Sequence, residues 1–195
     1  MTSVSIGNGV TSIDCYTFQD CSSLESVTIP DSVQSIGGMA FENCSILTSV
    51  DIPDSVESIR YDAFYSCSSL QSINVSGGNA NYKSEDGVLF SKDGANLIQY
   101  LAGKTDTSYS IPDSVQSIGW YAFYDCSSLT SVTYKGISEP KNPSSVFYDC
   151  TSLTSVDVPT NYEVNTFCGK PVNKIIFSIS SKDDFASFMT TPAYW

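Results

Sequence analysis

The chain has few side chains suited to catalysis. It contains no histidine, which excludes Ser-His-Asp and Cys-His arrangements and removes the usual general base at neutral pH. Paired carboxylates remain, because Asp51 and Asp157 are expected on one face of the molecule. They lie several repeats apart, however, and Asp31, Asp54 and Asp113 occupy P-D-S turns, where Asp accepts hydrogen bonds from backbone N–H groups. We therefore expect no enzymatic activity.

Two short segments resemble ligand-binding motifs but do not match the residue patterns that those motifs require. Gly103-Lys104-Thr105 ends like a phosphate-binding loop, but Ile98 stands where that loop needs a glycine. Residues 93–96 are too short for a calcium-binding EF-hand loop. The chain also lacks a C-x-x-C pair that would suggest zinc. The sequence thus predicts no catalytic site, no metal site and no cofactor.

The seven cysteines are better explained as core residues than as reactive groups. Cys15 and Cys168 stand alone and are expected to be the more exposed ones. A free cysteine packs as a small hydrophobe, so the other five should form a buried column of thiols. Neighbouring Cα atoms there would be close enough for a disulfide, but parallel side-chain directions disfavour one. The five occupy one position of a repeat, beside an inward Phe: Cys21, Cys44, Cys67, Cys126 and Cys150.

A repeat of 23 residues positions these side chains. Residues 29–50 read IPDSVQSIGGMAFENCSILTSV, and residues 52–73 read IPDSVESIRYDAFYSCSSLQSI. The register extends back to Ile6 and resumes at Ile111, and a 24-residue variant ends with Val156. A period of this length, with L-x-x-V-x-I at one point of each unit, is the signature of a leucine-rich repeat solenoid.

Each unit predicts a strand, a turn and a short helix. In residues 47–52, Leu47, Val50 and Ile52 alternate with polar residues, as in a strand with one buried face. Pro53 lacks an N–H group and should end that strand. The three-residue spacing of Ala63, Phe64 and Cys67 favours one or two helical turns. We predict an α/β-type repeat solenoid with one parallel sheet and short helical turns on the opposite side.

One turn of the solenoid carries an insertion. The spacing between Val75 and Ile111 is 36 residues, 13 more than the repeat. Residues 88–90 and 97–100 are apolar and flank Asp93-Gly94, a strong turn signal, so we predict a β-hairpin insertion near 76–110.

We interpret residues 1–177 as one solenoid of about six coils of 23–24 residues, with a terminal half-coil at 159–177. Residues 178–195 are predicted to pack on its end. Residues 1–6 align with 47–52, so the chain begins inside a repeat, and we expect a fragment of a longer protein.

The net charge of the chain limits the classes of molecule that it could bind. The formal net charge of −12 argues against nucleic acid and against anionic membranes. The sequence also lacks an apolar run of about 18–20 residues that would span a bilayer. Attachment to a membrane would therefore come only through other parts of a longer chain.

Two surfaces remain as candidate binding sites. The outward positions of the strands form a smooth surface rich in hydroxyl groups, although Ser and Thr also simply keep a sheet soluble. We predict that this strand face binds the ligand, through Ser26, Thr28, Ser49, Asp51, Ser72, Asn74, Ser131, Thr133, Ser155 and Asp157. The alternative is the aromatic side chains near the predicted helical turns, Tyr61, Tyr65, Trp120 and Tyr124.

The repeat I-P-D-S-V-x-S-I-G-x-x-A-F-x-x-C-S-S-L-T-S-V resembles the BspA-like leucine-rich repeats of bacterial and protozoan surface proteins, over about residues 1–159. The Cys-Ser-Ser-Leu-Thr-Ser phrasing is most similar to trichomonad members. Residues 82–94 also look like the hairpin insertion that recurs in this family, although Leu101 stands where the family more often has Pro.

The resemblance implies display at a cell surface or secretion, and binding of protein or glycoprotein ligands of a host or neighbouring cell. It brings no catalytic residue. We expect a non-enzymatic recognition or adhesion module. The alternatives are a structural spacer domain of a larger surface protein and a carbohydrate-binding module.

Overall fold

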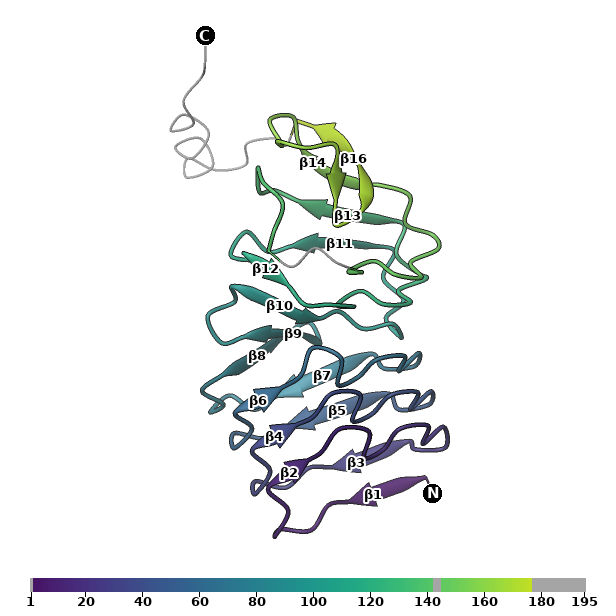
Figure 1. Cartoon of the computed structure of the whole chain (residues 1–195), viewed down its shortest axis with the longest axis vertical. Coiled ribbons are helices and arrows are strands. Elements are labelled where there is room, and N and C mark those ends of the chain that lie inside the picture. Colours follow the sequence, from purple (N-terminus) through teal and green to yellow (C-terminus); the bar gives the residue numbers. More distant parts are fainter. Residues whose placement is uncertain (1, 142–144, 177–195) are drawn as a thin grey trace.

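Two columns of short parallel strands run along the length of the molecule (Figure 1). The computed structural model describes residues 2–141 and 145–176. The first column holds the L-x-x-V-x-I strands: β1 (Ser3–Ser5), β3 (Ser26–Thr28), β5 (Ser49–Ile52), β7 (Ser72–Val75), β11 (Ser108–Ile111), β13 (Ser131–Tyr134), β14 (Val156–Pro159) and β16 (Lys170–Ile175). The second column holds β2 (Ser12–Ile13), β4 (Ser35–Ile36), β6 (Ser58–Ile59), β10 (Asn96–Gln99) and β12 (Ser117–Ile118).

The register of the strands equals the sequence repeat. Ser49 of β5 pairs with Ser72 of β7, a shift of 23 residues, and Val132 pairs with Val156 where the repeat has 24. Alternate residues of a strand point to opposite faces, so Val50 is buried while Ser49 is exposed. The predicted parallel solenoid is confirmed. The second column was not predicted from the sequence; in it the Ser-Ile pairs of successive coils align, as Ser35 and Ser58 do.

The predicted helical turns are wrong. Residues 2–141 and 145–176 contain no helix. In the arc that follows β4, the N–H groups of Phe41 and Asn43 donate to the carbonyl oxygens of Ala63 and Tyr65 in the next coil, at 2.9 and 3.2 Å. Donors used in this way are lost to the i−4 bonds of an α-helix. Asn43 also has a positive φ of 57°, which interrupts a right-handed helix.

The three-residue spacing that suggested helices has another cause. The N–H of Cys44 donates to the carbonyl oxygen of Phe41 at 3.2 Å, and the N–H of Leu47 donates to that of Cys44 at 3.1 Å. These are successive turns with bonds between residues three apart. Each turn returns one side chain to the core without forming a helix.

Stacked aromatic rings fill the core beneath the arcs. The rings of Phe18, Phe41 and Phe64 stack with centroid distances of 5.2 and 5.4 Å. Farther along, the Phe123 ring lies 5.0 Å from that of Tyr100 and is stacked on it. Such pairs are worth about 0.5–1.5 kcal/mol beyond the burial of their area. Because the repeat places like residues above one another, a single Phe position yields a ladder of contacts.

The cysteines form a second ladder beside these rings. All seven are free thiols. The Sγ atoms of Cys44 and Cys67 donate to the carbonyl oxygens of Phe18 and Phe41 in the preceding coil, at 3.2 and 3.0 Å. Cys21 is only half-buried, because its coil is the first described one and has a neighbour on one side. The predicted column of reduced thiols is therefore confirmed, with partial exposure at its first member.

The prediction that Cys168 is among the more exposed cysteines is wrong. Cys168 is 6% exposed, and its N–H donates to Glu139 Oε1. It follows Phe167 in the short strand β15 (Thr166–Phe167) and belongs to the core at the C-terminal end of the described chain. Cys15 is exposed, as predicted.

The insertion forms the predicted hairpin and divides the core. β9 (Val88–Ser91) pairs antiparallel with β10, and β8 (Tyr82–Glu85) pairs antiparallel with β9. Alternate side chains of β9 and β10 enter different cores. Leu89 and Ile98 pack with the N-terminal coils, whereas Val88, Phe90 and Leu97 pack with the C-terminal coils.

One buried amide anchors the insertion. Asn79 is 0% exposed. Its Nδ2 donates to the carbonyl oxygens of Pro53 and Val56, at 2.8 and 3.0 Å, and its Oδ1 accepts from the N–H groups of Asn81 and Tyr82. Both polar atoms of the Asn79 side chain are therefore hydrogen-bonded, at the point where the chain leaves the preceding coil and enters the insertion.

The described chain ends in a short hairpin. β15 pairs antiparallel with β16, and β16 adds to the first column beside β14. The terminal half-coil predicted at 159–177 therefore falls on β15 and β16, except for its last residue. Residue 177 and the predicted extension 178–195 lie outside the described residues.

Thiol labelling tests the cysteine ladder. We expect a thiol reagent to modify Cys15 rapidly and Cys21 more slowly in the native protein, because reaction needs an accessible sulfur. The other five should react only after denaturation, as mapped by peptide mass spectrometry. Native labelling of Cys168 as fast as that of Cys15 would contradict the structure.

Alkaline pH tests the burial of one ladder thiol. Burial first, and then the neighbouring Cys21, raise the pKa of Cys44 from its ordinary 9.0 to about 12. The folded state therefore holds this proton more tightly, and the stability it contributes below pH 9 is lost as the pH rises towards 12.

We expect the difference in unfolding free energy between the wild type and Cys44→Ala to shrink by about 1.4 kcal/mol per pH unit above the unfolded-state pKa. Urea unfolding at a series of alkaline pH values measures this difference. The contributions of other titrating groups are the same in both proteins and cancel when one value is subtracted from the other. If the unfolding free energies of the two proteins changed with pH in parallel, the pKa of the Cys44 thiol would be the same in the folded and unfolded states.

Candidate functional site

The predicted strand-face residues lie at outward positions of the first column, but the insertion separates them into two groups. Ser26, Thr28, Ser49, Asp51, Ser72 and Asn74 come from β3, β5 and β7, whereas Ser131, Thr133, Ser155 and Asp157 come from β13, β14 and the residue before β14. β7 and β11 are not paired. Instead, the N–H of Ile73 donates to the carbonyl oxygen of Gly87, in the turn of the β8–β9 hairpin, at 3.0 Å.

Several polar groups of the strand face already bond to one another. Asn74 Nδ2 donates to Asp51 Oδ1 at 2.8 Å. Asn173 Nδ2, on β16, donates to Ser155 Oγ at 2.7 Å and to Asp157 Oδ1 at 3.1 Å. A partner that binds here would replace bonds already made, so each contact would add little net free energy. The strand face is flat, polar and weakly anchoring.

The aromatic side chains of the alternative site gather on the arc side of the molecule. The Tyr65 ring lies 4.2 Å from the Tyr124 ring and 5.2 Å from that of Tyr121. The Tyr124 ring stacks on that of Tyr148 with centroids 6.0 Å apart. We call this surface the aromatic belt and define it as Tyr61, Tyr65, Trp120, Tyr121, Tyr124 and Tyr148.

The belt combines supported rings with exposed ones. Trp120 is 58% exposed, Tyr148 55% and Tyr61 41%. Tyr65, Tyr121 and Tyr124 are half-buried, contact one another, and form a base on which the exposed Tyr148 ring lies. Solvent-exposed aromatic groups on a rigid base are the usual anchors of protein interfaces.

A shortened corner brings the two halves of the belt together. Four residues lie between Ile59 and Phe64, but only two lie between Leu97 and Tyr100, which occupies the same ladder position as Phe64. The coil of the insertion therefore lacks two residues of its corner. Tyr65 from the coil before it then reaches Tyr124 from the coil after it.

Buried polar groups close the shortened corner. Gln99 is 6% exposed, and its Nε2 donates to the carbonyl oxygens of Tyr100 and Ala122, at 2.9 and 3.2 Å. Gly119 lies so close to Tyr61 that a Cβ atom at that position would stand 2.7 Å from Tyr61 Cδ1. This glycine lets Tyr61 lie beside Trp120.

The electrostatics of the belt follow from its acidic rim. Asp125 and Asp149 directly follow Tyr124 and Tyr148. Burial first, and then the charge of Asp149, raise the pKa of Asp125 above its ordinary value. Burial first, and then the hydroxyl of Tyr124, raise the pKa of Tyr65. The belt is thus apolar at its centre and negatively charged at its edge.

Two kinds of feature are absent from the described residues, a cluster of metal-type ligands and a membrane-spanning helix. In residues 2–141 and 145–176, no three His, Cys, Asp or Glu side chains converge as metal ligands would. Within the same ranges, no helix has the length and apolar character needed to cross a membrane.

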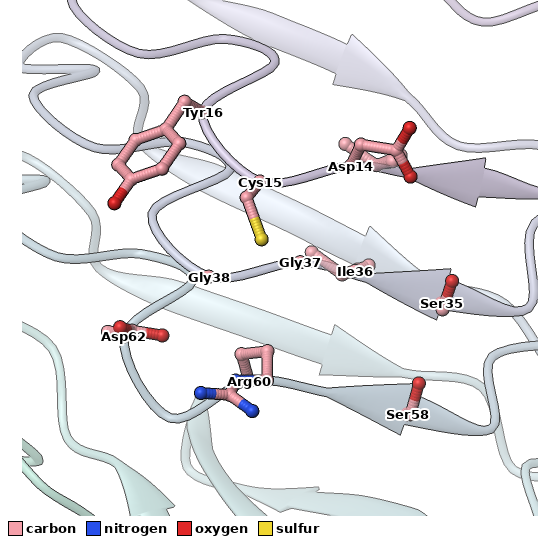
Figure 2. Close-up of a pocket in the computed structure, with 11 residues that line it drawn as sticks. Asp14, Cys15, Tyr16, Ser35, Ile36, Gly37, Gly38, Ser58, Arg60 and Asp62 are labelled. Atoms are coloured by element: carbon pink, nitrogen blue, oxygen red, sulfur yellow. The ribbon is translucent and has the colours of Figure 1, made fainter.

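Sequence reasoning missed a hollow at the corner that follows β2, β4 and β6. Cys15 and Tyr16 border it on one coil, and Arg60 and Asp62 border it two coils farther along (Figure 2). At the same corner the coil between them has Gly37 and Gly38, preceded by Ser35 and Ile36, which also line the hollow. The available signal was this Gly-Gly pair, which stands where the adjacent repeats carry Asp14-Cys15 and Arg60-Tyr61.

Stability measurements test the two layers of the belt. Tyr65→Ala should lower the unfolding free energy by about 1–3 kcal/mol, because it removes two aromatic contacts of about 0.5–1.5 kcal/mol each. Tyr148→Ala removes a mostly exposed ring and should cost about 0.5 kcal/mol or less. Urea unfolding measures both, and equal losses would show that the rings do not form a base and an exposed layer.

Comparisons with known proteins agree with this fold. Among solved structures, a leucine-rich repeat protein from Eubacterium ventriosum is 25% identical with a TM-score of 0.60, over 86% of this chain and 56% of that one. A leucine-rich cell surface protein from Faecalibacterium prausnitzii is 24% identical with a TM-score of 0.65, over 100% and 64%. The pneumococcal vaccine antigen PcpA is 20% identical with a TM-score of 0.54, over 94% and 71%.

The chain thus spans 56% and 64% of the length of the first two of these proteins. A search of curated proteins gives no significant match. The model of the BspA type leucine rich repeat region matches in six copies, over residues 1–91 and 102–186. With its 23-residue register, its parallel solenoid and this match, the chain belongs to the BspA-type leucine-rich repeat family.

Proposed function

We propose that this protein is a non-enzymatic recognition module, displayed at a cell surface or secreted, that binds a protein or glycoprotein ligand through the aromatic belt. The observation that carries the proposal is the exposure of Trp120, Tyr148 and Tyr61 together with a cluster of contacting tyrosines on which Tyr148 lies. Rings held in this way lose little side-chain entropy on binding.

The charge of the belt indicates the kind of ligand surface it suits. Asp125 and Asp149 lie at its rim, and the whole chain carries a net charge of −12. Basic side chains of a partner would be attracted to this rim. An arginine or lysine over the exposed Trp120 ring would gain a cation–π contact. The proposed ligand therefore presents apolar groups among basic ones.

The strand face is the second candidate site. Its outward positions repeat from coil to coil, so many weak contacts can add across one surface. Against it, the insertion splits the face and several of its polar groups bond to each other. We therefore rank it below the belt.

The proposed location rests on similarity. One of the similar structures is a leucine-rich cell surface protein, and the family is one of surface proteins. Two other roles compete with recognition. A structural spacer would need only the rigid stack of coils, and a carbohydrate-binding module would need aromatic rings beside polar donors and acceptors.

Paired variants test the proposal. Purified wild-type protein would be measured by biolayer interferometry against a panel of immobilised extracellular proteins and glycoproteins, with flow cytometry on intact cells in parallel. The belt variant replaces Tyr61, Trp120 and Tyr148 with Ser, and the strand-face variant replaces Asp51, Asn74 and Thr133 with Lys. All replaced side chains are exposed or half-buried, so both variants should retain the wild-type unfolding transition.

We expect the belt variant to bind at least about tenfold more weakly than wild type, because it loses its anchoring rings. The strand-face variant should bind as wild type does. The opposite pattern would move the site to the strand face. Absence of binding by the wild type to every member of the panel and to cells would count against recognition and favour the spacer.

A further inference from the structure

The hollow bordered by Cys15, Tyr16, Arg60 and Asp62 is formed by the first three coils, and the only belt residue next to it in the chain is Tyr61, between Arg60 and Asp62. The hollow has a volume of about 450 Å³, which is within the range of about 300–1,000 Å³ typical of small-molecule sites. Ser35 and Ser58, at the ends of β4 and β6, complete its lining (Figure 2).

The two glycines create this space. A Cβ atom on Gly37 would stand 2.5 Å from the backbone nitrogen of Cys15, so the coils approach too closely there for any side chain. A Cβ atom on Gly38 would stand 2.9 Å from Asp62 Oδ1. At Gly37 and Gly38 the middle coil therefore contributes bare backbone, while the coils on either side contribute the side chains of Cys15, Tyr16, Arg60 and Asp62 (Figure 2).

The walls of the hollow carry complementary hydrogen-bonding groups without partners. Asp62 Oδ1 is buried and accepts no hydrogen bond from the described residues. Arg60 is exposed and forms no ion pair within the described part of the chain, where the ion pairs are Lys83 with Glu85 and Lys104 with Asp106. A carboxylate that only accepts and a guanidinium that only donates thus face one space.

This combination suits hydroxyl groups. A hydroxyl both donates and accepts, so adjacent hydroxyls on one ring satisfy a carboxylate and a guanidinium together. The charges of Arg60 and Asp62 offset each other, and Asp14, which also lines the hollow, adds a negative charge, so a neutral ligand is favoured over an anionic one. Tyr16 is 55% exposed and supplies an aromatic surface for the apolar C–H groups of a ring.

We propose that the hollow is a binding subsite for one neutral sugar residue, with Asp62 accepting from and Arg60 donating to neighbouring hydroxyls, and with the sugar packed on Tyr16. The inference adds a second site to the proposed function, since a glycoprotein ligand would carry such sugars. It does not depend on the belt, because the sugar would bind without any protein partner.

Nuclear magnetic resonance titration tests the subsite. The probes are methyl glycosides of neutral hexoses and N-acetylhexosamines, added to uniformly ¹⁵N-labelled protein, with methyl glucuronide as an anionic comparison. At least one neutral glycoside should cause saturable shifts of the Gly37, Gly38 and Arg60 amides, with a dissociation constant on the order of millimolar. The glucuronide should bind more weakly.

Matched variants localise the effect. Asp62→Asn keeps the shape but removes the charged acceptor, and it should weaken binding on the order of tenfold. Gly38→Ala puts a methyl group against the Asp62 carboxylate and should abolish the shifts. Gly7→Ala is the control, because a Cβ atom there meets nothing within 4 Å. Thermal unfolding checks that each variant folds.

The proposal is overturned if no neutral glycoside gives saturable shifts at these amides, if Asp62→Asn and Gly38→Ala bind as wild type does, or if the glucuronide binds more tightly than every neutral sugar. Sugar binding by a variant with only Trp120 and Tyr148 replaced by Ser separates the two hypotheses, because Tyr61 stands between Arg60 and Asp62 in the chain and is left unchanged. That variant should retain the sugar shifts even where it loses a macromolecular ligand, so either site can fail without the other.

Discussion

The structure depends on backbone hydrogen bonds between successive coils in a constant register. Strand pairs join residues 23 apart, and alternate N–H groups of the arcs donate to the next coil, as Phe41 does to Ala63. Because these bonds consume the arc donors, the arcs become ladders of turns. The same register stacks Phe18, Phe41 and Phe64, and it sets the thiols of Cys44 and Cys67 on carbonyl oxygens of the preceding coil.

The insertion is where this constraint is broken, and its effects reach the surface. The β8–β9 hairpin separates the described core into two clusters and interrupts the first column between β7 and β11. The corner after β10 is two residues shorter than its counterparts, so Tyr65 meets Tyr124 across it. One change in chain length thus divides the strand face and assembles the aromatic belt.

Both proposed sites lie where the repeat departs from its pattern. The belt surrounds the shortened corner, and the hollow exists because Gly37 and Gly38 replace side chains that other coils carry. Residues that obey the pattern, such as Phe41 and Cys44, are buried and serve the stack. A repetitive scaffold gains specific recognition from its irregular positions, because only these give one coil a surface that its neighbours lack.

The sequence by itself determined the solenoid, its register, the hairpin and the reduced thiol column, because each follows from periodicity and local turn chemistry. It misassigned the arcs, since a three-residue spacing fits both a helix and a series of turns, and only the bonds to the next coil distinguish them. It misplaced Cys168, whose burial depends on how the last described hairpin meets the core. The sequence indicated Tyr61, Tyr65, Trp120 and Tyr124 as a candidate surface, but tertiary structure alone decided which rings of the belt meet and that the hollow exists. Both bring together residues two coils apart, and that proximity depends on a missing corner or a missing side chain in the coil between them.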